Sequence, residues 1–201
     1  SKNIFNGCKN LKSISLPDGI TEISDSAFML CSSMTSVSIP HSVKKIGKNA
    51  FRGCKSLTTL VIPDSVTTID ANAFFGTGLV VLEIPDSVIN LSCTFSNCYS
   101  LKKLRIPNSV TELKREMFFE NYQFNAKSLE SINLPASLKK MDSFVFYEFE
   151  NLKELIIPDA LTKIEFESNP NFGEMQFSGT ALPLVTQKRI KDMGYKGSFK
   201  N

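Results

Sequence analysis

Short segments that alternate apolar and polar residues recur along the chain, and each one ends in a proline. LKSISLP, LTTLVIP and LKKLRIP are three of seven such segments. Alternation with a period of two is typical of a short β-strand with one buried face. The closing prolines recur every 22, 23 or, once, 28 residues, which predicts a solenoid of stacked coils. They are Pro17, Pro40, Pro63, Pro85, Pro107, Pro135 and Pro158.

Three apolar positions in each segment can be buried only if successive coils stack. In the first copy these positions are Leu11, Ile14 and Leu16. Coils stacked about 4.8 Å apart would bury them as continuous ladders. Because every coil runs in the same direction, we expect a parallel sheet. Proline ends each strand because it removes a backbone donor.

The second half of each unit ends in a phenylalanine, usually after a small residue. About 11 residues separate proline from phenylalanine, so short extended or 3₁₀ pieces are expected there. A stack of rings inside the solenoid would explain why the chain has 16 Phe residues and no Trp. The expected spine consists of Phe28, Phe51, Phe74, Phe95, Phe118 and Phe146.

The consensus of the units, C-x-x-L-x-x-[IL]-x-[IL]-P-x-S-V-T-x-I-x-x-x-A-F, closely resembles the leucine-rich repeats of the BspA type. The likeness covers residues 3 to about 166, and residues 179–197 are similar to the closing segment of some such proteins. The resemblance implies a right-handed leucine-rich-repeat coil with parallel strands on its concave side. It also implies a bacterial protein that is secreted or exposed on the cell surface, since several members are adhesins for host proteins or partner microbes.

We expect two parts of the chain. Residues 1–172 would form about seven repeats of 22–28 residues plus the end of a preceding one, which Asn3–Cys8 resembles. Residues 173–201 would form a C-terminal cap with a helix at about 182–193. Leu182, Val185 and Met193 lie at helical spacing, so their face would cover the last coil. In an alternative interpretation, the basic residues of this helix bind an anionic surface.

The five cysteines suggest buried thiols more than a metal site. Cys8, Cys31, Cys54 and Cys98 share one column of the repeat. Other units place Thr, Ala or Phe near that position, so the column is expected to be a buried slot for reduced cysteines. A ladder spreads its thiolates along an axis, which does not suit zinc. Cys93 lies outside the column and is the candidate for a reactive or pairing thiol.

Composition and motif searches favour a non-catalytic protein. The net charge of +3 is too small to indicate nucleic acid as a partner, and no apolar run is long enough to span a membrane. Motifs for metalloproteases, serine hydrolases and phosphate-binding loops are absent. The single histidine, His41, follows Pro40 and is expected in a surface turn. We expect neither a cofactor nor a metal ion.

The outward-facing residues of the strands form two strips on the concave side. The first three repeats contribute mostly Ser and Thr, whereas the middle repeats combine apolar and charged side chains. Such a mixture is typical of a protein-binding surface. The candidate residues are Val61, Val81, Glu83, Lys103 and Arg105. Alternatively, Glu83 and Arg105 only pair across neighbouring strands, which would stabilise the fold by a few tenths of a kcal/mol.

Five extra residues lie between Phe118 and Leu129. Insertions in repeat proteins form loops at an edge of the solenoid, and such loops often carry function. Phe119, Tyr122 and Phe124 in this insert are candidate anchors for a partner. Alternatively, these rings fold back over the ladder.

These observations predict a monomeric, non-catalytic module that binds a protein through its concave face, and the family resemblance implies a host or partner protein. An extracellular or cell-surface location follows from the family resemblance. Two alternatives are an intracellular or periplasmic scaffold and the targeting module of a larger enzyme.

Overall fold

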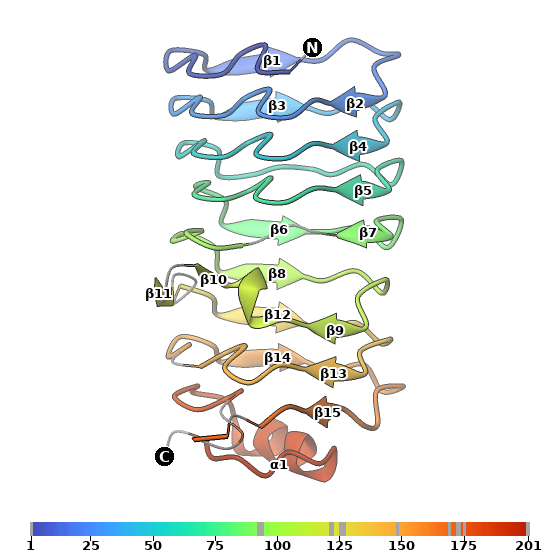
Figure 1. The fold of residues 1–201 in the computed structure, drawn as a ribbon, viewed down its shortest axis with the longest axis vertical. Coiled ribbons are helices and arrows are strands. Elements are labelled where there is room, and N and C mark those ends of the chain that lie inside the picture. The colour runs from blue at the N-terminus through green and yellow to red at the C-terminus, as the bar shows by residue number, and fades with distance from the viewer. Residues whose placement is uncertain are drawn as a thin grey trace.

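The computed structural model describes residues 2–91, 95–120, 123–124, 128–147, 149–168, 170–171, 174 and 176–199. It is a stack of coils with the two chain termini at opposite ends (Figure 1). Strands of successive coils pair in parallel, and one short helix lies at the C-terminal end. The predicted solenoid is therefore confirmed.

Three-residue strands lie on one side of the stack, which we call the strand face and which is the side expected to be concave. Each strand is short because a proline follows it by two residues, as Pro17 follows Ser15. The register aligns residues of the predicted strips, such as Val81 with Lys103. The strands are β1 (Ser13–Ser15), β3 (Ser36–Ser38), β6 (Val81–Glu83), β8 (Lys103–Arg105), β12 (Ser131–Asn133) and β14 (Glu154–Ile156).

Two-residue strands form a second set of parallel pairs, which we call the short ladder. The 3₁₀ helix η1 (Arg115–Met117) and these short strands are the kind of pieces that the spacing from proline to phenylalanine predicts. The insert adds an antiparallel hairpin of β10 (Phe119–Glu120) and β11 (Gln123–Phe124). The short ladder consists of β2 (Glu22–Ile23), β4 (Lys45–Ile46), β5 (Thr68–Ile69), β7 (Asn90–Leu91), β9 (Glu112–Leu113), β13 (Lys140–Met141) and β15 (Glu165–Phe166).

The strand face is interrupted at the third coil. β1 and β3 form one sheet, and β6, β8, β12 and β14 form another. Residues 59–62, which the alternation predicts as the strand between them, have no strand assignment. Among the described residues, no backbone N–H of this segment donates a hydrogen bond to a neighbouring coil; the nearest inter-coil bond runs from Val80 N to Thr58 O at 3.0 Å.

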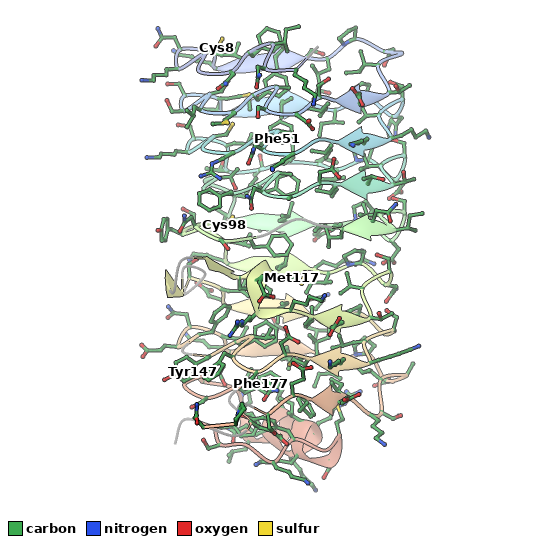
Figure 2. The ribbon with its side chains drawn as sticks, viewed as in Figure 1. Cys8, Phe51, Cys98, Met117, Tyr147 and Phe177 are labelled. Carbon is green, nitrogen blue, oxygen red and sulfur yellow. The ribbon has the colours of Figure 1, made fainter. Side chains whose placement is uncertain are left out.

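The phenylalanine spine fills the interior, as the sequence predicts (Figure 2). Phe28, Phe51 and Phe74 are buried, and their rings stack nearly parallel with centroids 5.5 and 6.2 Å apart. Phe95 and Phe118 are also buried but tilted by 39°. The described residues show no ring contact between Phe74 and Phe95, so the spine is interrupted where the shortened fourth unit joins it.

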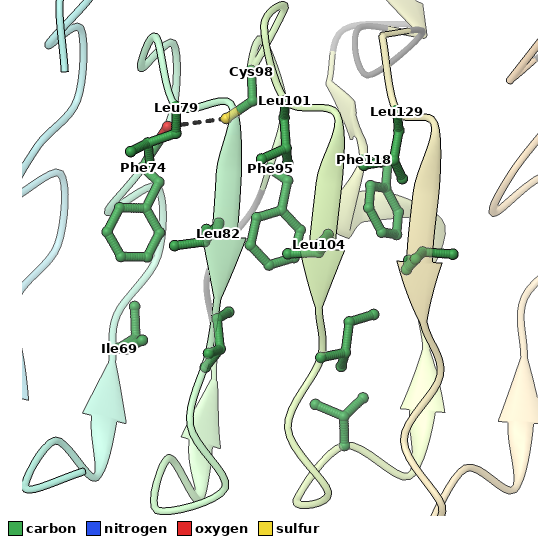
Figure 3. Close-up of a cluster of buried hydrophobic side chains, with 14 of the residues drawn as sticks. Ile69, Phe74, Leu79, Leu82, Phe95, Cys98, Leu101, Leu104, Phe118 and Leu129 are labelled. Atoms are coloured by element: carbon green, nitrogen blue, oxygen red, sulfur yellow. Dashed lines mark hydrogen bonds between the residues drawn. The ribbon is translucent and has the colours of Figure 1, made fainter. Parts of the chain in front are cut away.

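The cysteine column lies inside the stack and bonds adjacent coils together. The thiols of Cys31, Cys54 and Cys98 each donate a hydrogen bond of 3.1 Å to a phenylalanine carbonyl of the preceding coil. Figure 3 shows the bond from Cys98 to Phe74. Burial raises the pKa of Cys54 to about 12 and that of Cys98 to about 11. The prediction of buried, reduced thiols is confirmed for these three residues and wrong for Cys8, which is exposed in the first coil. Cys93 lies outside the described residues.

A bulky alkylating reagent should therefore distinguish Cys8 from the other members of the column. In a Cys93→Ser background, we expect native protein to be labelled rapidly at Cys8 alone and denatured protein at four thiols. The physical reason is that burial both blocks access and disfavours the reactive thiolate. Mass spectrometry of the labelled protein measures this directly, and fast native labelling of Cys54 would contradict the packing.

A short helix holds the C-terminal cap against the last coil. The helix α1 (Leu184–Asp192) starts after Pro183 at its N-cap, and buried Leu182, Ile190 and Met193 face the stack. Val185, expected on this face, is instead 78% exposed, because it precedes buried Ile190 by five residues, about 140° around the helix axis. Arg189 Nη2 donates to the Pro158 carbonyl at 2.9 Å and ties the helix to the last coil. The division of the chain at residue 172 stays a prediction.

Candidate protein-binding surface

The middle of the strand face brings the predicted candidate residues together around one groove. The groove has a volume of ≈ 730 Å³ and is lined by Val61, Val81, Glu83 and Arg105, together with residues of the interrupted third coil. Val61 is 81% exposed and Val81 is 38% exposed, so two apolar side chains project beside charged ones. Lys103 lies in an adjacent groove of ≈ 250 Å³ that shares Val81, Glu83 and Arg105.

The groove carries more negative than positive charge. Arg105 Nη2 lies 2.6 Å from Asp86 Oδ2, and its Nη1 donates to the Ile84 carbonyl at 2.7 Å. The backbone N–H of Asn108, at 2.8 Å, and the Arg105 guanidinium hold the pKa of Asp86 below 3.8. Asp64 and Glu83 also line the groove, and neither forms an ion pair with a described residue.

The alternative pairing of Glu83 with Arg105 is wrong. The two residues are neighbours in the register of β6 and β8, but the guanidinium turns toward Asp86 in the turn after β6. The carboxylate of Glu83 is therefore exposed and available, while Arg105 is held in place by two polar partners. Ser131 also differs from expectation: the alternation places it among the outward-facing residues of the strands, but its side chain is buried.

The insert forms a hairpin at one edge of the stack. In Figure 1, β10 and β11 lie at the left edge, at the height of β8. This position agrees with the prediction that an insertion forms an edge loop. Tyr122 lies outside the described residues, and only the backbone of Phe119 and Phe124 is described. Their role as anchors stays a prediction.

The interruption at the third coil is the feature of this surface that the sequence does not indicate. The segment LTTLVIP matches the other strand segments in its alternation and its closing proline. Because residues 59–62 form no ladder with β3 or with β6, a groove opens on each side of this segment. The groove on the side of β3 has a volume of ≈ 310 Å³ and is lined by Ser38, His41 and Val61. His41 lies in an exposed turn, as predicted.

A group of carboxylates lies on the short ladder, away from the groove. Oxygens of Glu112, Asp142 and Glu167 lie within 4.8 Å of one another. The Lys140 ammonium pairs with Glu167 and lies 3.5 Å from Glu112, so a protein cation already compensates this charge. Burial, followed by the hydrogen bond with Glu167, raises the pKa of Asp142 to about 6. The Lys140 partner lowers the pKa of Glu167.

Asp142→Asn is expected to stabilise the protein at neutral pH and not at acid pH. A pKa above the ordinary 3.8 makes the protonated form favour folding, so this contribution is complete below about pH 4 and lost as the pH rises through about 6. The lowered pKa of Glu167 has the opposite sign, and its main cause, the hydrogen bond with Lys140, is present in both proteins. After allowance for solvent screening, we expect a gain of about 1 kcal/mol at pH 7.5 and almost none at pH 4. Urea denaturation at both pH values measures it, and an equal change at both would contradict the assignment.

No helix in the described ranges is long and apolar enough to cross a membrane. Leucine-rich repeat proteins are generally non-catalytic and generally mediate interactions between proteins.

Comparison with solved structures gives the same architecture. A leucine-rich repeat protein from T. pallidum is 31% identical, with a TM-score of 0.71; the match covers 94% of this chain and 86% of that one. A leucine-rich repeat protein from Bacteroides ovatus is 27% identical, with a TM-score of 0.71; the match covers 90% of this chain and 44% of that one. The chain therefore spans less than half of the Bacteroides ovatus protein. The pneumococcal vaccine antigen PcpA shares the fold at 23% identity, with a TM-score of 0.52 over 77% of this chain and 38% of that one.

The sequence comparisons assign the family. No curated protein gives a significant match to the chain. The profile described as the BspA type leucine rich repeat region matches in six copies, over residues 1–93 and 119–178. These ranges cover well over half of the chain and contain most of the strands and the spine that the structure stacks. The chain belongs to the BspA-type leucine-rich repeat family.

Proposed function

We propose that this chain is a non-catalytic, adhesin-like module that binds a host or partner protein through the middle of its strand face. The observation that carries this proposal is the groove of ≈ 730 Å³ at the interrupted third coil, where exposed Val61 lies beside Glu83, which forms no ion pair within the described part of the chain. The backbone beneath is fixed by the short ladder and the spine, so binding orders few side chains. Exposed apolar area next to oriented charge gives both affinity and specificity.

A secreted or cell-surface location is part of the same proposal. Its support is the family, whose members are often surface proteins. Labelling of intact source cells with antibodies against the chain tests the location separately from binding. Staining only after permeabilisation would overturn the location and leave the binding proposal to its own test.

The binding test uses paired variants of the strand face. Val61→Asp with Glu83→Lys changes both the apolar and the charged part of the groove. Ser13→Asp with Ser15→Lys makes matching changes on exposed β1, at the end of the same face. Immobilised proteins are compared for binding to a panel of host extracellular and surface proteins.

We expect the groove variant to lose at least about tenfold in affinity, because it removes apolar contact and inverts one charge. The β1 variant should bind like the wild type. Equal binding by both variants would place the contact away from the groove. Loss in the β1 variant alone would move it to the first coils.

A further inference from the structure

A second pocket lies on the turn edge of the stack, separate from the strand face. It has a volume of ≈ 460 Å³ and lies where coils two to five turn from the phenylalanine spine toward the strands. Cys98, labelled at the left of Figure 2, belongs to this edge. We call this second pocket the edge pocket and define it by Leu30, Arg52, Lys55, Phe75 and Tyr99.

The backbone under the edge pocket favours glycine or asparagine, and Leu30 is the exception. Residues at this position of successive coils adopt a left-handed conformation, with φ of 75° for Gly7, 61° for Leu30, 74° for Gly53, 65° for Gly76 and 60° for Asn97. A branched, bulky side chain is strained there, whereas Gly and Asn are tolerated. A retained strain of this kind often marks a functional site.

The Leu30 side chain forms one wall of the pocket. It lies over Gly53, where a Cβ atom would approach Leu30 Cδ2 to 2.8 Å. The Leu30 side chain is nevertheless 45% exposed, so much of its surface can still contact a ligand. Tyr99 is 65% exposed, and its hydroxyl donates to Asn97 Oδ1 at 2.9 Å. Leu30, Phe75 and Tyr99 therefore offer apolar and aromatic surface to a ligand.

The charged residues that line the edge pocket, Arg52 and Lys55, are both positive. The Arg52 guanidinium carbon lies 4.0 Å from the centroid of the Phe75 ring, which orients the guanidinium. Lys55 lies at the rim and is exposed. No carboxylate lines the pocket, and neither cation forms an ion pair with any residue that the structure describes.

We propose that the edge pocket binds an acidic peptide segment of a partner protein, one that carries a carboxylate beside a large apolar side chain. The guanidinium of Arg52 donates two parallel hydrogen bonds to the carboxylate, and Lys55 adds a second positive charge. The apolar side chain of the peptide lies between Leu30 and Tyr99. The volume suits one or two side chains and not a folded domain. This preference is opposite to that of the strand-face groove, where Asp64, Glu83 and Asp86 outnumber Arg105.

The test is an NMR titration of ¹⁵N-labelled full chain with two capped peptides, Gly-Asp-Phe-Asp-Leu-Gly and its Asn analogue Gly-Asn-Phe-Asn-Leu-Gly. We expect the Asp peptide to shift the amide signals of Arg52, Gly76 and Tyr99. The Asn analogue should bind at least about tenfold more weakly, because it cannot form charge-assisted bonds. Heparin, a polyanion without apolar side chains, should not produce the same shifts at Tyr99.

Two variants separate the charged and the apolar parts of the pocket. The double variant Arg52→Gln with Lys55→Gln should lose the preference for the Asp peptide. The control is Lys9→Gln with Lys12→Gln, which replaces two exposed lysines of the first coil. This control should keep the preference. Leu30→Asn introduces the residue that Asn97 already places at this position. This variant should unfold at an equal or higher urea concentration than the wild type, and its affinity for the Asp peptide should be about fivefold lower or weaker still.

Three results would overturn the proposal. The first is the absence of shifts at millimolar Asp peptide. The second is equal binding of the Asp and Asn peptides or of heparin, which would show that the carboxylate and its apolar neighbour are not recognised together. The third is wild-type binding by the folded Leu30→Asn variant. None of these outcomes bears on the strand-face groove, so the two proposals fail independently.

Discussion

Phe74→Ala is expected to lower the free energy of unfolding by about 3–5 kcal/mol, the range for loss of a fully buried aromatic ring. The Phe74 ring is 0% exposed and stacks on Phe51 with centroids 6.2 Å apart. Figure 3 shows Phe74 among the buried side chains of the core. Alanine would leave a cavity between two coils that the paired strands hold at a fixed separation. In a solenoid each coil contacts only its neighbours, so no distant side chain can fill that space.

Phe75→Ala is the matched control for this prediction. The neighbouring ring is half-buried under the Arg52 guanidinium. Its removal should cost about 1 kcal/mol, since little buried area is lost. Urea denaturation followed by circular dichroism measures both variants. Similar values for the two would show that the Phe74 ring does not form part of a closed core.

Gly78→Ala is expected to destabilise the protein by about 3 kcal/mol, through a steric clash and without loss of any side chain. A Cβ atom at Gly78 would lie 2.0 Å from the carbonyl oxygen of Lys55. That oxygen belongs to the backbone of the preceding coil, so it cannot move aside as a flexible side chain can. The backbone N–H of Gly78 also donates to the Cys54 carbonyl at 3.3 Å, and the clash would break this bond.

Gly76→Ala separates this clash from backbone strain. Gly76 has a φ of 65°, and a Cβ there would lie 4.0 Å from the nearest neighbour. Its replacement should cost about 1 kcal/mol, the value for one residue forced into the left-handed region. Chemical denaturation of the two variants side by side gives the comparison. An effect of Gly76→Ala equal to that of Gly78→Ala would mean that the coils can separate at little cost.

The architecture could be predicted because it depends on repeated local signals. Each closing proline sets the phase of a strand, and each phenylalanine occupies the same place in the spine, so an error in one coil is corrected by the others. Val185 had no such repetition. Its predicted face depended on which residues of a single helix contact the core, and the face centred on Ile190 leaves Val185 on the exposed side.

The candidate surface could be predicted only in part. The alternation places Val61, Val81, Glu83 and Arg105 on one face, and the structure confirms that they line one groove. The partner of Arg105 depends on the turn after β6, which brings Asp86 within reach, so that Arg105 pairs with Asp86 and not with Glu83. The interrupted third coil leaves no mark in its own sequence. The third coil comes immediately before the shortened fourth unit. Its ring, Phe74, lies 6.2 Å from Phe51, the widest spacing among the stacked rings of the spine.

The interruption of the strand face does not coincide with an interruption of the short ladder, and this offset has a mechanical consequence. The short ladder continues unbroken from β2 through β4 and β5 to β7, past the third coil. Its own break falls between β7 and β9, where β6 and β8 are paired on the other side. The two interruptions thus fall at different coils, and every boundary between successive repeats is crossed by hydrogen bonds of the strand face or of the short ladder. A pulling force along the axis would therefore meet no plane of easy cleavage, although the strand face taken alone is split in two.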